Sequence, residues 1–259
     1  MYRHARFGVA VLGCALLAMR ASIADQIATD VNIVTAVDIS NSVSMEEMNI
    51  ELDGMAQAIR DPRVLQAIQA GRQHRIGFAM FAWHHDQFPT IVSWTTIASD
   101  EDMVSVSRAI AARKLINTEL EGRAQVEWYI GRLTDLSQAI DHASEMLQAA
   151  PFASDRTIIN VVGDGEDNVA EDAYVARDRF VETGGTLNGV VLGDDPKVIE
   201  YFQHRVMGGP HAFVMATSDA PSLVEAFARK FLGDIIAAAG IAKPPATMLR
   251  SSSRGHGVE

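Results

Sequence analysis

Residues 31–42 read Val-Asn-Ile-Val-Thr-Ala-Val-Asp-Ile-Ser-Asn-Ser, an apolar run that ends in a carboxylate and two hydroxyls. The nearly continuous apolar part, 31–38, is typical of a strand that is buried on both faces of a helix-covered parallel sheet. Directly after it, Asp38, Ser40 and Ser42 stand two residues apart. Side chains of this kind offer the oxygen ligands that a hard divalent cation prefers. The stretch therefore predicts both a type of sheet and a place for a metal ion.

The rest of the chain continues the alternation of strand-like and helix-like segments. Apolar runs bounded by turn residues predict further strands at 75–83, 90–94, 157–162, 187–192 and 212–216. Apolar residues at helical spacing, with capping residues before them, predict helices at 44–59, 101–114, 136–147, 171–182, 196–204 and 221–238. This order is typical of an α/β fold with a doubly wound, mainly parallel sheet and helices on both faces.

The N-terminal residues predict export. Arg3 and Arg6 precede a short apolar stretch, and Ser22 and Ala24 supply small residues for cleavage, so that 1–24 is a predicted signal peptide. The only cysteine, Cys14, gives an alternative, in which it becomes the lipid-bearing N-terminus of a lipoprotein. The apolar run continues past this cysteine, which favours ordinary cleavage.

The remaining chain is predicted to form one domain, at about 26–240, followed by a disordered tail at 241–259. Loss of 1–24 would remove three arginines and no acidic residue, which leaves 19 basic and 33 acidic residues and a net charge of −14. This charge disfavours nucleic acid as a partner, and the apolar N-terminal stretch is too short for a membrane span. We therefore expect a periplasmic or extracellular protein.

Candidate metal ligands follow several of the predicted elements. Sites in such sheets lie beyond the carboxyl ends of the strands, where Asp38, Ser40, Ser42 and Asp164 are expected. Thr134 joins them if the helix after it begins at the same edge. Mg²⁺ takes six oxygen ligands, and Mn²⁺ or Ca²⁺ are alternatives. Three hydroxyls and two carboxylates would leave a coordination position for an acidic side chain of a protein partner.

The set Asp38-x-Ser40-x-Ser42, Thr134 and Asp164 resembles the metal-ion-dependent adhesion site (MIDAS) of von Willebrand factor type A (VWA) domains. The resemblance covers nearly the whole mature chain, and 187–191 and 208–214 look similar to an exported bacterial branch of that superfamily whose role is not established. It implies a Rossmann-like fold, a bound Mg²⁺, Mn²⁺ or Ca²⁺, and protein binding rather than catalysis. Gly163 departs from the family pattern, and Asp167 is an alternative to Asp164 in the third loop.

A phosphatase is the alternative function. Residues 163–168, Gly-Asp-Gly-Glu-Asp-Asn, also resemble a loop of haloacid-dehalogenase-like phosphatases, in which Asp38 would be the nucleophile. Those enzymes need a second carboxylate two residues later, whereas this chain has Ser40, whose hydroxyl cannot transfer protons near neutral pH. The sequence also has no glycine-rich Lys-Ser/Thr loop, Gly-x-Ser-x-Gly or His-Glu-x-x-His motif. We therefore predict a binding module without catalytic activity.

Overall fold

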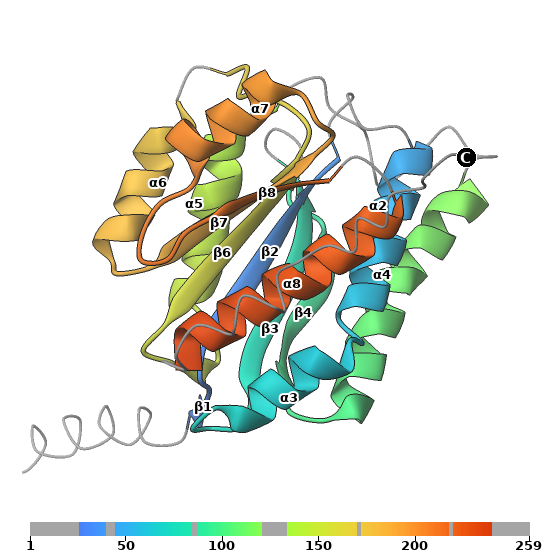
Figure 1. Cartoon of the computed structure of the whole chain (residues 1–259), viewed down its shortest axis with the longest axis vertical. Helices are drawn as coiled ribbons and strands as arrows, with labels where there is room; N and C mark the ends of the chain where they lie inside the picture. Colours follow the sequence, from blue (N-terminus) through green and yellow to red (C-terminus); the bar gives the residue numbers. More distant parts are fainter. Residues whose placement is uncertain are drawn as a thin grey trace, which may run out of the picture.

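The computed structural model describes residues 26–39, 45–83, 87–120, 134–169, 172–217 and 220–239. The predicted signal peptide and tail lie outside these residues, as do two of the candidate ligands, Ser40 and Ser42. Within the described residues, strands and helices alternate along the chain (Figure 1).

Six strands form the central sheet, in the order β4-β3-β2-β6-β7-β8. All neighbours are parallel except β3 and β4, which are antiparallel. The mainly parallel α/β sheet predicted from the sequence is therefore confirmed. The strands span Asn32–Asp38 (β2), Ile76–Trp83 (β3), Thr90–Ile97 (β4), Thr157–Gly163 (β6), Thr186–Leu192 (β7) and Val214–Thr217 (β8). A separate two-stranded pair, Ile27–Ala28 (β1) with Phe152–Ala153 (β5), was not predicted.

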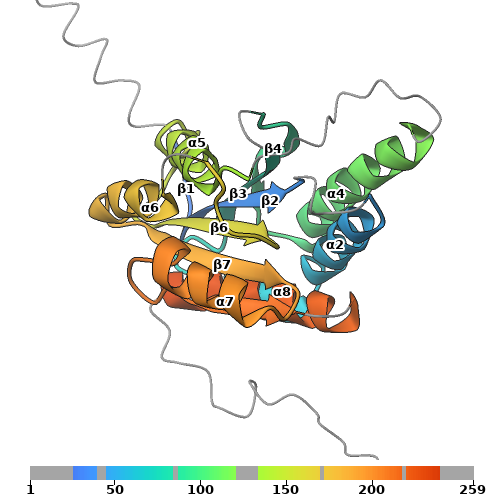
Figure 2. The same ribbon diagram turned by 90° about the horizontal axis from the view of Figure 1, so that it is seen from above.

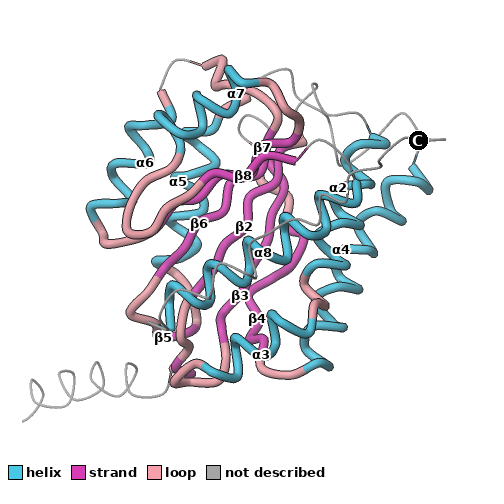
Figure 3. Tube along the Cα trace, in the orientation of Figure 1, coloured by secondary structure: helices cyan, strands magenta, loops and turns pink. Residues whose placement is uncertain are grey.

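Helices cover both faces of the sheet, with the strands between them (Figures 2 and 3). One face packs against Met45–Ala58 (α2), Pro62–Ala70 (α3), Asp100–Leu120 (α4) and Ala220–Ala239 (α8). The other face packs against Leu136–Gln148 (α5), Ala173–Glu182 (α6), Pro196–Tyr201 (α7) and the π-helical turn Phe202–Val206 (η1). Among these described helices, none combines the length and apolar character required to cross a lipid bilayer.

Strand β2 lies in the middle of the sheet, and all seven of its residues are buried. Its side chains alternate between the two cores: Ile33 and Val37 pack on the α8 side, whereas Val34 and Ala36 pack on the α5 side. This is the two-sided burial that the apolar run predicts. The last residue of the strand, Asp38, is brought by this packing to the end of the central strand with no exposed surface.

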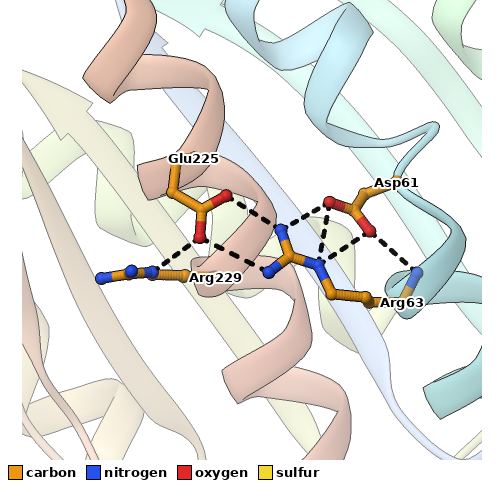
Figure 4. A network of polar contacts seen from close by, with 4 residues as sticks. All are labelled: Asp61, Arg63, Glu225 and Arg229. Atoms are coloured by element: carbon orange, nitrogen blue, oxygen red, sulfur yellow. Dashed lines mark hydrogen bonds and ion pairs between the residues drawn. The ribbon is translucent and has the colours of Figure 1, made fainter. Parts of the chain in front are cut away.

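The sequence predicted that Asp61-Pro62 would end a helix, and α2 does end shortly before them. It did not predict that Pro62 begins α3, a position that suits proline because no helical partner is needed for its missing N–H. Asp61 caps this helix by accepting the Arg63 backbone N–H at 2.8 Å. The Arg63 guanidinium also donates to Asp61 and to Glu225 on α8, and Glu225 accepts from Arg229 (Figure 4). These bonds join α3 to the last helix.

Candidate metal centre

Three segments of the chain meet at the carboxyl edge of the sheet, where a metal site was predicted. They are the end of β2, the end of β6 with the loop that follows it, and the two residues that precede α5. The contacts described below join the β6 segment to each of the other two, although Asp38 lies 96 residues before Thr134 and Thr134 lies 30 residues before Asp164.

Asp38 is buried at the end of β2, next to two neighbouring strands. It lies in register with Trp83 at the end of β3, and the backbone N–H of Ile39 donates to the Trp83 carbonyl at 3.0 Å. On its other side, a Cβ built on Gly163 of β6 would lie 3.3 Å from Asp38 Oδ2. A buried carboxylate needs compensation by hydrogen bonds or by a cation. Its place is therefore suited to a metal ligand.

Gly163 departs from the VWA pattern, and the structure gives a physical reason for the glycine. In addition to Asp38 Oδ2, a Cβ at this position would meet Phe202 Cζ at 3.5 Å. A side chain here would push against the carboxylate of Asp38. The glycine lets β6 lie close to Asp38 and places Asp164, the next residue, at the same edge of the sheet, where it is half-buried.

Thr134 is buried and is tied to the same loop as Asp164. Its backbone N–H donates to Asn168 Oδ1 at 3.0 Å, and its carbonyl accepts the Asn168 N–H at 3.1 Å. Thr134 does not cap α5, because Asp135 does so by accepting the Gln138 N–H at 3.0 Å. Thr134 is therefore the residue before the cap of α5 and not the cap itself.

Asp167, the alternative ligand for the third loop, contacts the start of α5. Its Oδ1 accepts the Leu136 N–H at 3.3 Å. Burial, together with the neighbouring carboxylate of Asp135, raises the pKa of Asp167 to about 7. One oxygen of Asp167 thus holds the N-terminus of α5.

The loop after β6 gives this edge a strongly acidic character. Glu166, Asp167 and Asp172 follow Asp164 within nine residues. Burial raises the pKa of Tyr201, and the carboxylates of Asp167 and Asp172 raise it further. Like charges held this close favour a cation among them.

The described residues contain no group of three or more Asp, Glu, His or Cys side chains placed to hold a metal ion. This is consistent with the predicted donor set, which has only two carboxylates and takes its other oxygens from hydroxyls. Two of those hydroxyls, Ser40 and Ser42, are outside the described residues. The donors that are described, Asp38, Thr134 and Asp164, have the hard oxygen chemistry that Mg²⁺, Mn²⁺ and Ca²⁺ share.

Two residues that organise this edge were not predicted. Asp135 caps α5, and its pairing with Gln138 three residues later is a capping-box pattern that the sequence does contain. Asn168 fixes Thr134 through two hydrogen bonds across 34 residues, and no local pattern indicates such a contact.

A family model described as "Protein of unknown function (DUF1194)" matches residues 28–239. No curated protein matches the chain.

Solved structures with the same fold are distant in sequence. A von Willebrand factor type A protein from Catenulispora acidiphila is 17% identical, with a TM-score of 0.51, over 80% of this chain and 43% of that one. The pilus adhesin SpaC from Lactobacillus rhamnosus GG is 13% identical, with a TM-score of 0.52, over 82% of this chain and 30% of the adhesin. Proximal thread matrix protein 1 from the mussel byssus, with a zinc-occupied MIDAS motif, is 14% identical, with a TM-score of 0.50, over 83% of this chain and 50% of the matrix protein. The chain thus spans half or less of these proteins, and its fold is VWA-like.

Proposed function

The chain belongs to the DUF1194 family of proteins of unknown function, and from its VWA-like fold and the geometry at the carboxyl edge we propose that it is an exported adhesion module. In this proposal a divalent cation is held by Asp38, Ser40, Ser42, Thr134 and Asp164. The cation binds an acidic side chain of a protein partner. The domain would comprise about 26–240, after cleavage of 1–24.

One observation carries the proposal: a fully buried carboxylate at the end of the central strand lies beside a glycine that leaves room for it. Asp38 has no exposed surface, and Gly163 would touch its Oδ2 if it had a side chain. The same glycine precedes Asp164, and the loop of Asp164 is bonded to Thr134. Residues of three predicted ligand segments are thereby grouped at one edge.

The donor types support Mg²⁺ as the native cation, with Mn²⁺ and Ca²⁺ as alternatives. Carboxylate and hydroxyl oxygens suit these hard ions, and the chain after residue 24 has no thiol to favour a softer one. With two carboxylates in the set, the ion would attract a further anionic oxygen. An acidic side chain of a partner supplies one.

Metal binding can be tested without knowing the partner. Isothermal titration of the full chain with Mn²⁺ and Mg²⁺ should give saturable binding, and Asp38→Asn should abolish it. Asp155→Asn is the matched control, because Asp155 is 97% exposed and lies at the opposite end of β6. Equal binding by Asp38→Asn and the native chain would contradict the proposed site, provided that both give the same circular dichroism spectrum.

Partner binding is tested by affinity capture from the exported proteins of the source cell, with and without EDTA. The proposal expects a protein that is retained with Mg²⁺, released by EDTA and not retained by Asp38→Asn. If a protein were captured equally well with EDTA and by Asp38→Asn, its contact with the domain would not be mediated by the metal. Hydrolysis of a generic phosphate ester, lost in Asp38→Asn, would instead support the phosphatase.

A further inference from the structure

A cavity of about 270 Å³ opens at the amino edge of the sheet, opposite to the candidate metal site. Its lining residues belong to the first residues of β6 and β7, the segment before β8, and the last turns of α8. The side chains that the argument below uses are those of Arg156, Thr186, Asn188, His211, Phe213 and Asp234. Its volume is slightly below the range for drug-sized ligands, so it suits a molecule of monosaccharide size.

The floor of the cavity is a buried polar network. Asn160 and Asn188 are paired across β6 and β7, and each donates to one oxygen of Asp234, at 2.9 Å and 3.0 Å. The ammonium of Lys230 donates to both Asp234 oxygens at 2.8 Å and also to Asn160 Oδ1. All four side chains are at most 1% exposed. Because the charge of Asp234 is balanced by Lys230, the floor is polar without net charge.

Asn188 can bind a further polar group. Its Nδ2 donates to Asp234, and its Oδ1 accepts the Phe213 N–H at 3.0 Å. An amide has two N–H donors and two acceptor lone pairs, and these bonds use one of each. The hydroxyl of Thr186 donates to the Pro210 carbonyl at 2.9 Å, which leaves its oxygen able to accept. The cavity wall therefore offers hydrogen bonds suited to hydroxyl groups.

A tight turn places His211 at the mouth of the cavity. Gly209 has φ +87°, and a Cβ there would lie 2.2 Å from the Gly185 carbonyl oxygen. His211, two residues on, has φ 61°, which is uncommon for a residue with a side chain. Arg156 lies at the same mouth.

Gly233 keeps the cavity open. It stands inside α8, where glycine is less favourable than alanine. A Cβ at this position would be 3.5 Å from the Phe213 ring, an ordinary contact, so the fold does not require glycine there. A longer side chain would project into the cavity that Gly233 lines.

We propose that this cavity binds a small hydroxylated organic anion, such as a sugar acid. Its carboxylate is recognised by Arg156 and His211, and its hydroxyls by Asn188 and Thr186. The carbon skeleton packs on Phe213. This site is separate from the metal edge and does not depend on the function proposed for that edge.

D-Glucuronate is a suitable probe, with D-glucose as its neutral counterpart. Isothermal titration and saturation-transfer NMR of the full chain in EDTA should show glucuronate binding at least tenfold more tightly than glucose. Arg156→Gln should weaken glucuronate binding about tenfold, since a charge-assisted hydrogen bond is lost. Arg72→Gln is the matched control, because Arg72 is 80% exposed and does not line the cavity. It should leave the affinity unchanged.

Gly233→Met tests the location by filling the cavity, and it should abolish binding. Its thermal melting is measured alongside, and Arg156→Gln, a surface change, provides the test if that variant does not fold. Equal affinity for glucose and glucuronate would overturn the anionic class of ligand. Undiminished binding by a folded Gly233→Met, or by Arg156→Gln, would overturn the site. So would a failure of glucuronate, galacturonate and gluconate to bind at millimolar concentrations.

Discussion

Asp38 and Gly163 face each other across neighbouring parallel strands, so closely that a Cβ on Gly163 would lie 3.3 Å from Asp38 Oδ2. The glycine that departs from the VWA pattern is therefore part of the environment of Asp38, a candidate ligand with no exposed surface. This contact joins the first and third ligand segments, and it can be disturbed by a single methyl group.

Gly163→Ala should lower the affinity for Mn²⁺ more than it lowers the stability of the protein. The new methyl would displace the Asp38 carboxylate by a few tenths of an ångström, and we expect a loss of about 1 kcal/mol in the free energy of unfolding. Gly165→Ala is the matched control, because nothing lies within 4 Å of its Cβ. Urea denaturation and Mn²⁺ titration of both variants measure the two effects. Equal metal affinity in both would show that Gly163 does not shape the site.

The stability of the metal-free protein should depend on the protonation of Asp167. Its pKa is about 7 in the folded state, above the value of about 4 for an unfolded chain. The folded state holds this proton more tightly, so its stabilising contribution is complete below about pH 4 and is lost as the pH rises through about 7. Asp167→Asn should flatten that part of the profile in urea denaturation with EDTA. An unchanged slope, matching that of Asp155→Asn, would contradict this assignment.

Lys230→Met should destabilise the protein by about 3–5 kcal/mol, because it leaves the carboxylate of Asp234 buried without its cation. Arg229→Met removes a neighbouring cation from the same helix. Arg229 pairs with Glu225 near the surface, and its loss should change the free energy of unfolding by about 0–1 kcal/mol. Urea denaturation of the two variants provides the comparison. If the two variants lost similar amounts of unfolding free energy, the buried ion pair would not be what stabilises the packing of α8.

Asp61→Ala should destabilise α3 by about 0.5–2 kcal/mol, because it removes the cap and an ion pair with Arg63. Asp61→Asn should cost less, since asparagine also caps helices. Hydrogen bonds from Arg63 lower the pKa of Asp61, so its contribution is present above about pH 4 and is lost as the pH falls further. Urea denaturation at neutral and acidic pH measures the free energy of unfolding of both variants. Equal decreases in that free energy would show that the capping hydrogen bond is not the cause of the destabilisation.

The sequence predicted the fold class because strands and helices that are buried in a core can be recognised from the spacing of their apolar residues. The run at 31–38 is apolar on both faces, and the structure places it in the middle of a mainly parallel sheet. Helical boundaries were less accurate where the chain turns sharply: α3 was missed because Asp61-Pro62 was interpreted only as an end, although the same pair is also a good start. The predicted helix at 196–204 is α7 followed by the π-helical turn η1.

The sequence by itself determined the alternation of elements and the residue types at the strand ends, since both depend on local pattern. It could name Asp38, Thr134 and Asp164, but not their surroundings. Only the tertiary structure set Gly163 against Asp38, bonded Thr134 to Asn168, and enclosed Lys230 with Asp234, Asn160 and Asn188. These contacts join residues far apart in the chain, and their energies come from burial and close approach, which exist only after the sheet and its helices have packed.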